Sequence, residues 1–183
     1  LYIAALLLSV SGSFPEQEEE RKAALAAVVE GLDFKLGLDT VSPSLQALSV
    51  ALRSGAIRAD FSQRKGISLL MRLAEHASSM NAETQYLLML CTWLACFDRE
   101  SAEEVDLAGV RTLASILRGD SRKNAIRLAL GTLRILLETL GKDKQQSVSE
   151  ALIELKVPKQ LSILADKAAI NSDVELMDDL KYI

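Results

Sequence analysis

The sequence has few of the residues that build metal or redox sites. Its 183 residues include one histidine and two cysteines, Cys91 and Cys96. The two cysteines lie in one stretch that we expect to be helical and point to different faces, and a single histidine cannot complete a tetrahedral metal site with them. We therefore predict no metal, and we interpret both cysteines as reduced thiols in the core of a cytosolic protein.

The glycine patterns that bind nucleotides are missing as well. A phosphate-binding loop needs a glycine, four further residues, then Gly-Lys and a hydroxyl residue. Gly141-Lys142 is followed by Asp143, and Leu136 stands where the first glycine should be. The sequence also lacks a glycine-rich dinucleotide turn, and its single histidine excludes most histidine-based catalytic arrangements. We predict no cofactor and no enzymatic activity.

Neither a strong charge of one sign nor a long apolar run is present. The 21 Lys and Arg residues against 25 Asp and Glu residues give a net charge of −4, which argues against a nucleic-acid partner. The apolar segment 1–10 is shorter than the roughly 20 residues that cross a bilayer, so we predict no direct membrane insertion. We interpret it as part of a helix in which the chain begins.

Only 3 prolines and 9 glycines interrupt a sequence rich in alanine and leucine, which favours helices over strands. The clearest helix is 81–97, with Asn81 as its N-cap. Its first apolar stripe consists of Leu87, Leu90, Leu94 and Phe97, and its second of Tyr86, Met89 and Trp93. A helix that is apolar on most sides must be covered on several sides, so we predict that it is buried. We expect Trp93→Ala to cost about 3–5 kcal/mol.

This pattern returns 43 residues later, where Asn124-Ala125 repeats Asn81-Ala82 and Leu136 matches Trp93. The preceding segment 66–75 obeys the same offset. Units of this length are typical of armadillo and HEAT arrays, in which stacked neighbours bury faces that one unit cannot bury alone. We predict an all-α, armadillo/HEAT-like right-handed superhelical solenoid. Its core should contain Leu90, Trp93, Leu94, Phe97, Leu133, Leu136 and Leu137.

Capping and breaking residues predict the remaining helix boundaries. Ser42-Pro43 is typical of a helix start, and the apolar face of that helix would consist of Leu45, Leu48 and Leu52. A capping box is expected at 101–104. Gly141 should end the second long helix, and 142–146 should form a polar loop.

We expect the whole of 1–183 to form a single helical-repeat domain. Within it, 1–40 would hold an incomplete first repeat, and 173–183 would form an acidic terminal helix, because its apolar residues have helical spacing.

Several short runs resemble one known family by their order and spacing. The runs are Leu52-Arg53, Arg58-Ala59-Asp60-Phe61, Lys65-Gly66-Ile67, Gln85-Tyr86, Trp93-Leu94, Phe97, Ile126-Arg127, Leu133-Arg134, Ala151-Leu152-Ile153, Lys156-Val157, Lys159-Gln160-Leu161 and the segment 178–183. Together they resemble the regulatory H subunit of the vacuolar-type proton ATPase (V-ATPase), in its N-terminal domain, over about 45–183. Ile135 and Pro158 depart from the pattern of that family.

The resemblance implies a non-catalytic subunit on the cytosolic face of vacuolar and endosomal membranes. Such a subunit binds the peripheral stalk and other subunits of the rotary pump, and supports coupled ATP hydrolysis and proton transport. The resemblance also implies that the smaller C-terminal domain of the family is absent from this chain. The basic residues that could contact an acidic stalk helix are Arg53, Arg58, Arg122, Lys123 and Arg127.

Each of these five residues also has a purely structural or solvated alternative. Arg58, for example, could bond Asp60 or the carbonyl groups at a helix end. An armadillo adaptor protein, either a chaperone nucleotide-exchange factor or a transport receptor, remains the alternative function. The match of Trp93 with Leu136 and the lack of an asparagine ladder count against a transport receptor.

Overall fold

The computed structural model describes residues 18–33, 35, 37–118, 123–170, 174 and 180, and within these residues the regular structure is helical. The helices are α2 (Glu18–Glu30), α3 (Leu38–Ala51), α4 (Gly55–Gln63), α5 (Gly66–Ala74), the 3-10 turn η4 (Ala77–Ser79), α6 (Ala82–Ala95), α7 (Arg99–Glu104), α8 (Leu107–Arg118), α9 (Lys123–Thr139), α10 (Lys142–Glu154) and α11 (Val157–Ile170). The all-α prediction is confirmed. The predicted helical segment 1–10 and most of the predicted helix 173–183 lie outside the described residues.

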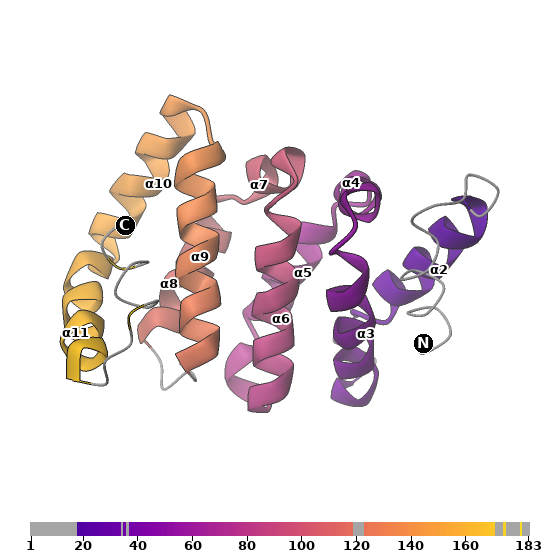
Figure 1. Ribbon diagram of the computed structural model, residues 1–183, viewed down its shortest axis with the longest axis horizontal. Helices are drawn as coiled ribbons and strands as arrows, with labels where there is room; N and C mark the ends of the chain where they lie inside the picture. Colours follow the sequence, from indigo (N-terminus) through magenta and orange to yellow (C-terminus); the bar gives the residue numbers. More distant parts are fainter. Residues whose placement is uncertain are drawn as a thin grey trace.

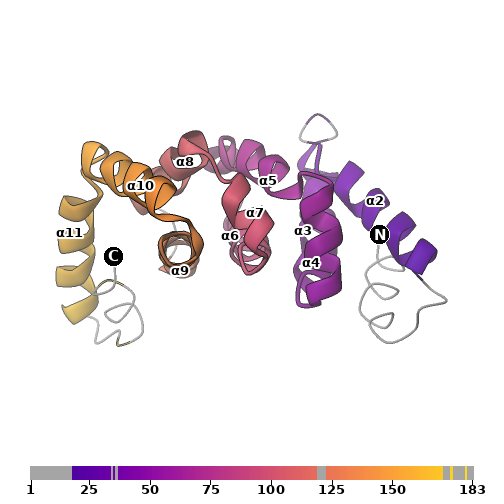
Figure 2. The same ribbon diagram turned by 90° about the horizontal axis from the view of Figure 1, so that it is seen from above.

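A set of three helices occurs twice in succession: α3, α4 and α5, then α6, α7 and α8. In each set the first helix is long, the second is short, and the third lies in the outer layer. The long helices α3, α6 and α9 stand side by side, each packed against the next (Figure 1). Seen from above, they form the inner row of an arch, with α5 and α8 behind them and α2 and α11 bending forward at the two ends (Figure 2). We call α3, α6 and α9 the inner row, and their open side the concave face.

The outer helices α5 and α8 repeat at the predicted offset of 43 residues. Their buried residues match one for one: Gly66, Ile67, Leu70, Met71, Leu73 and Ala74 in α5, and Gly109, Val110, Leu113, Ala114, Ile116 and Leu117 in α8. The predicted apolar face of α3 is also confirmed, since Leu45, Leu48 and Leu52 are fully buried. These side chains fill the space between the two layers, where burial of apolar surface stabilises the stack.

The predicted register of the inner row is wrong by two residues. The buried face of α6 contains Leu88, Met89, Cys91, Thr92 and Ala95, and that of α9 contains Ala129, Leu130, Thr132, Leu133 and Leu136. Leu136 therefore corresponds to Ala95, at an offset of 41, and not to Trp93. The cause is the connection: α6 begins eight positions after Ala74, whereas α9 begins six positions after Leu117, the residue that matches Ala74.

Three predicted boundaries differ from the structure. Helix α3 begins at Leu38, so Pro43 lies inside it and not at its start. Helix α10 begins at Lys142, so the predicted loop 142–146 is helical. The second error has a physical reason, because exposed Lys and Gln residues are good helix formers.

The third error concerns the helix cap of α7, which is Asp98 and not Ser101. A carboxylate oxygen of Asp98 accepts from the Ser101 backbone N–H at 3.0 Å. The predicted cap of α6 is confirmed, because Asn81 accepts from the Thr84 backbone N–H at 2.8 Å. Both caps act on the backbone N–H three residues ahead, as expected for this position.

Polar contacts tie successive repeats together along the edge that holds α4, α7 and the start of α10. Arg21 of α2 pairs with Asp60 of α4 at 2.8 Å, and both side chains are only 15% exposed. Lys65, which precedes α5, pairs with Glu104 of α7. Lys144 of α10 donates to the backbone carbonyl of Glu103 at 2.6 Å. Each repeat is thus held to the next by polar as well as apolar contacts.

Candidate partner-binding surface

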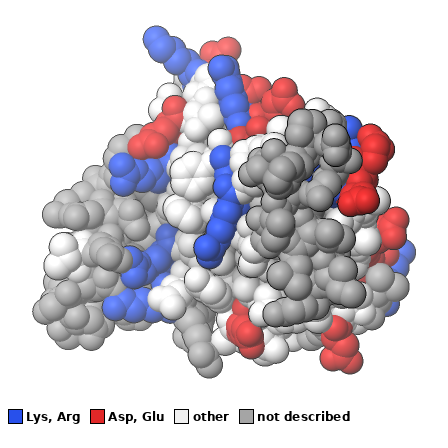
Figure 3. Space-filling model, turned by 45° about the vertical axis from the view of Figure 1, so that its right-hand side comes forward, with Lys and Arg blue, Asp and Glu red and all other residues white. Residues whose placement is uncertain are grey.

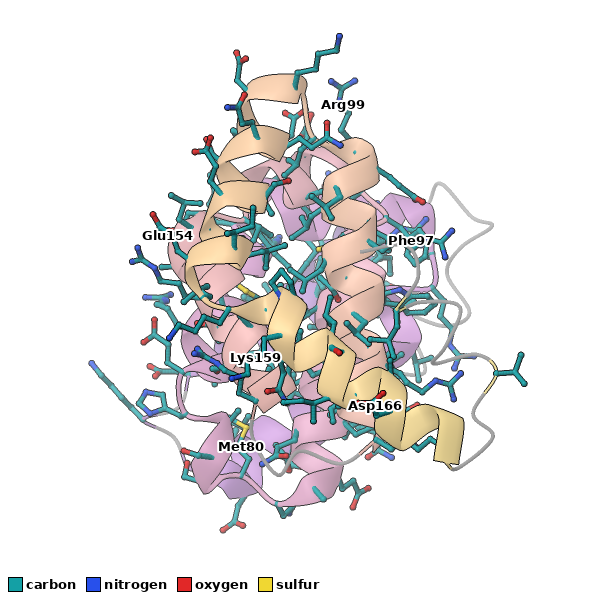
Figure 4. The ribbon with its side chains drawn as sticks, turned by 90° about the vertical axis from the view of Figure 1, so that its left-hand side faces the viewer. Met80, Phe97, Arg99, Glu154, Lys159 and Asp166 are labelled. Atoms are coloured by element: carbon teal, nitrogen blue, oxygen red, sulfur yellow. The ribbon has the colours of Figure 1, made fainter. Side chains whose placement is uncertain are left out.

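An aromatic stripe runs along the exposed side of α6. Tyr86 is 38% exposed and Phe97, just after the helix, is 52% exposed, while Leu90 and Trp93 between them are partly buried. The rings of Trp93 and Phe97 meet edge to face, with centroids 4.9 Å apart and planes at 79°. Figure 4 places Phe97 on the side of the molecule opposite to Glu154 of α10.

A shallow hollow of about 390 Å³ lies between α6 and α9 beside this stripe. It is lined by Tyr86, Trp93, Asn124, Arg127, Leu128 and Gly131. Gly131 allows the indole to lie close to α9, because a β-carbon at this position would stand 3.0 Å from Nε1 of Trp93. We call Tyr86, Leu90, Trp93 and Phe97, with the hollow beside them, the aromatic surface.

The prediction that Phe97 belongs to the core is therefore wrong, and Leu90, Trp93 and Leu94 are only partly buried. The buried side of α6 combines Leu87, Leu88 and Met89 with four small residues, Thr84, Cys91, Thr92 and Ala95. The buried Thr92 hydroxyl has a hydrogen-bond partner, because it donates to the Leu88 carbonyl at 2.9 Å. Small residues allow α3 and α9 to pack closely on both sides of α6. A prediction based on hydrophobicity alone places the larger side chains on the buried side.

The core predictions for α9 fit its structure better. Leu133 and Leu136 have no exposed surface, and Leu137 is partly buried against the core.

The five basic candidates do not form one cluster. Arg53 and Arg58 lie at the corner between α3 and α4, whereas Lys123 and Arg127 lie in the first turns of α9, at the opposite edge of the inner row (Figure 1). Arg122 lies outside the described residues. Lys123 is exposed, and Arg127 lines the hollow.

The structure gives Arg58 a structural role. Its guanidinium donates to the carbonyls of Leu52 at 2.9 Å and Arg53 at 3.1 Å, the groups left open where α3 ends. Asp60, the other partner considered for Arg58, pairs with Arg21 instead. Arg53 itself is exposed.

On two of the three inner-row helices, α6 and α9, basic residues slightly outnumber acidic ones. On the exposed sides of α6 and α9 the basic residues are Lys123, Arg127 and Arg134, and the acidic ones are Glu83 and Glu138. Figure 3 shows Lys and Arg side chains following one another across the visible part of this side, with Asp and Glu mostly toward its edges. Glu138 is paired with Arg134 at 3.1 Å, and the third inner-row helix, α3, adds the exposed acidic residue Asp39.

The two cysteines are buried and reduced, as predicted. The Cys91 thiol donates to the Leu45 carbonyl at 3.3 Å, across the contact between α6 and α3. Burial raises the pKa of Cys91 strongly and raises the pKa of Cys96 to about 12, so both thiols stay protonated at neutral pH. Among the described residues, no cluster of three histidine, cysteine or acidic side chains is arranged to hold a metal ion.

A second hollow, of about 600 Å³, lies between α2 and α5. Its lining mixes apolar side chains such as Val29, Leu69 and Leu73 with acidic and basic ones such as Asp33 and Arg72. Because both signs of charge line it, it favours no single class of partner.

Comparison with known families shows which family the chain belongs to. A family model described as the H subunit of the V-ATPase matches residues 1–183, the whole chain. The chain belongs to the V-ATPase H-subunit family.

Individual relatives agree with this assignment. The chain is 24% identical over 180 residues to a probable H subunit (form 1) of the V-type proton ATPase of Caenorhabditis elegans, and the match covers 96% of the chain and 39% of the relative. It is 31% identical over 143 residues to the H subunit of the V-type proton ATPase of Drosophila melanogaster, covering 73% of the chain and 30% of the relative. A probable rice H subunit is 25% identical over 146 residues.

Two further facts bear on this member of the H-subunit family. The chain spans between 30% and 39% of the length of these relatives. In the part of the chain that the structure describes, none of the helices has both the length and the apolar character needed to cross a membrane. The family match favours the vacuolar-type pump over the adaptor proteins considered as the alternative.

Proposed function

We propose that this chain is part of a non-catalytic regulatory subunit of the vacuolar-type proton-pumping ATPase. In this role it binds the peripheral stalk of the pump and supports coupled ATP hydrolysis and proton transport. It acts on the cytosolic face of the membrane through the complex, without inserting into the lipid. The observation that carries the proposal is the family match over the whole chain.

The architecture supports a role in the stationary part of a rotary machine. Such a part must transmit torque without yielding. Each inner-row helix packs against the next, and the Arg21–Asp60 and Lys65–Glu104 pairs join successive repeats at the edge. A stack in which every repeat is packed on its neighbours resists bending, because deforming one repeat disturbs the contacts of the next.

Binding to purified peripheral-stalk subunits tests the proposal. The chain is immobilised, and stalk subunits and, separately, a chaperone ATPase are passed over it. We expect saturable binding of the stalk subunits and none of the chaperone ATPase. Binding of the chaperone alone would overturn the proposal and favour the adaptor function.

A further inference from the structure

The concave face of the inner row carries aromatic side chains that the fold does not use for its core. Tyr86, Trp93 and Phe97 are three of only eight aromatic residues in the chain, and all three lie on one side of α6. Two of them are more than a third exposed. Aromatic side chains gathered on one exposed surface are typical of a contact site, whereas scattered ones are ordinary surface.

The hollow beside these rings gives the surface a shape. It has a volume of about 390 Å³ and is walled by Tyr86 and Trp93 on one side and by α9 on the other. Its floor includes Gly131, where any side chain would press on the indole. Tyr86, Trp93 and Leu128 can shield part of a bulky apolar side chain from water, while Asn124 and Arg127 make the rest of the lining polar.

The charged residues around the hollow indicate which charged groups the partner should carry. Among the described residues, Arg127 is the one charged residue that lines the hollow, and Lys123 lies one turn earlier on α9. Glu83, one turn before Tyr86, is the nearest acidic residue along α6. Two basic groups against one acidic group favour carboxylates over ammonium or guanidinium groups on the partner.

We infer that the aromatic surface binds an acidic helical segment of another subunit of the pump, with one bulky apolar side chain of that segment in the hollow. This inference rests on the proposed function and names the surface through which it operates. The apolar anchor supplies the affinity, and the carboxylates near Lys123 and Arg127 set the orientation and raise the association rate.

Trp93 is the only tryptophan of the chain, so its fluorescence reports directly on the hollow. The probe is a synthetic tryptophan-free helix of leucine and glutamate, and its control is the same helix with lysine in place of glutamate. We expect the acidic helix to shift Trp93 emission to shorter wavelength, with binding that weakens as salt is added. Equal binding of the lysine helix, or no change of emission, would overturn the inference.

Variants that remove only exposed rings test the surface while keeping the fold. We expect Tyr86→Ala and Phe97→Ala together to weaken binding of both the acidic helix and purified stalk subunits by about tenfold or more. The matched controls are Leu107→Ala and Ile153→Ala, which remove side chains that are 43% and 66% exposed but lie on α8 and α10, outside the inner row. Loss of binding in the controls to the same degree would contradict the inference.

The outcomes separate the inference from the proposed function. If stalk subunits bind the unaltered chain and the Tyr86/Phe97 variant equally, the inference fails and the proposed function stands. If the acidic helix binds at Trp93 but stalk subunits do not bind, the surface is assigned correctly and the proposed function fails. Sedimentation that shows a dimer dissolved by the same two substitutions would mean that the occupant is a second copy, which also overturns the inference.

Discussion

Gly131 lies directly beside the indole of Trp93, so that a β-carbon at residue 131 would stand 3.0 Å from Nε1. A second glycine, Gly66, makes a closer approach to a ring, with 2.3 Å between its ideal β-carbon and a ring carbon of Phe61. Trp93 is partly exposed and can move, whereas Phe61 is fully buried and cannot. Gly66 is therefore needed for the packing of a buried ring, whereas Gly131 lets a partly exposed indole lie close to α9.

Replacing each glycine by alanine should separate these roles. We expect Gly66→Ala to destabilise the fold by about 1–3 kcal/mol, the usual cost of forcing extra volume into a packed site. Gly131→Ala should change stability by less than about 1 kcal/mol, because the gain in helix propensity offsets a small shift of the indole. Urea unfolding measures both, and a larger loss in Gly131→Ala than in Gly66→Ala would contradict the described contacts.

The structure lowers the cost expected for Trp93→Ala and points to a more destabilising substitution in α9. Because Trp93 is partly exposed, Trp93→Ala should cost only about 1–2 kcal/mol, below the value expected from its sequence pattern. Leu136→Ala should cost about 2–5 kcal/mol, because Leu136 is fully buried where α9 packs on its neighbours. Denaturant unfolding of the two variants checks the order, and a Trp93→Ala variant less stable than Leu136→Ala would mean that Trp93 belongs to the core.

The sequence could predict the helices, the repeat and the outer-layer register, since α5 and α8 match position by position. It could not predict which side of α6 faces solvent. Both sides of that helix are apolar, and the choice depends on how closely α3 and α9 approach, which favours Cys91, Thr92 and Ala95 over larger residues. The connection before α9 is two residues shorter than the one before α6, so the buried residues of the two helices match at an offset of 41. The match of Asn124 with Asn81 at an offset of 43 wrongly indicated that the inner and outer helices share one offset.

The Arg21–Asp60 pair should contribute measurably to the junction between α2 and α4. Asp60→Ala leaves the guanidinium of Arg21 mostly buried without its partner, at a cost of about 1–3 kcal/mol. The matched control is Glu138→Ala, which breaks the more exposed pair with Arg134 and should cost less than about 0.5 kcal/mol. Equal losses in thermal unfolding of the two variants would show that the junction does not depend on the buried pair.

The buried cysteines predict how stability depends on alkaline pH. Both thiols have a raised pKa in the folded state, about 12 for Cys96, so the folded chain holds protons that the unfolded chain releases near pH 9. Their contribution is therefore complete below about pH 9 and is lost as pH rises toward 12, by up to about 1.4 kcal/mol per pH unit for each thiol.

A chain with Cys91→Ala and Cys96→Ala serves as the control for this slope. Unfolding at a series of pH values from 8 to about 10.5 should show a steeper loss of stability for the unaltered chain. Identical slopes would mean that the thiols reach solvent in the folded state.

The most direct test of the partner surface is a photocrosslink from single positions in the assembled pump. Benzoylphenylalanine replaces Phe97 in one preparation and Ile153 in another; both native side chains are more than half exposed, and the two positions lie on different layers of the arch. We expect a crosslink to a peripheral-stalk subunit from position 97 and none from position 153. A stalk crosslink from position 153 with none from position 97 would contradict the account.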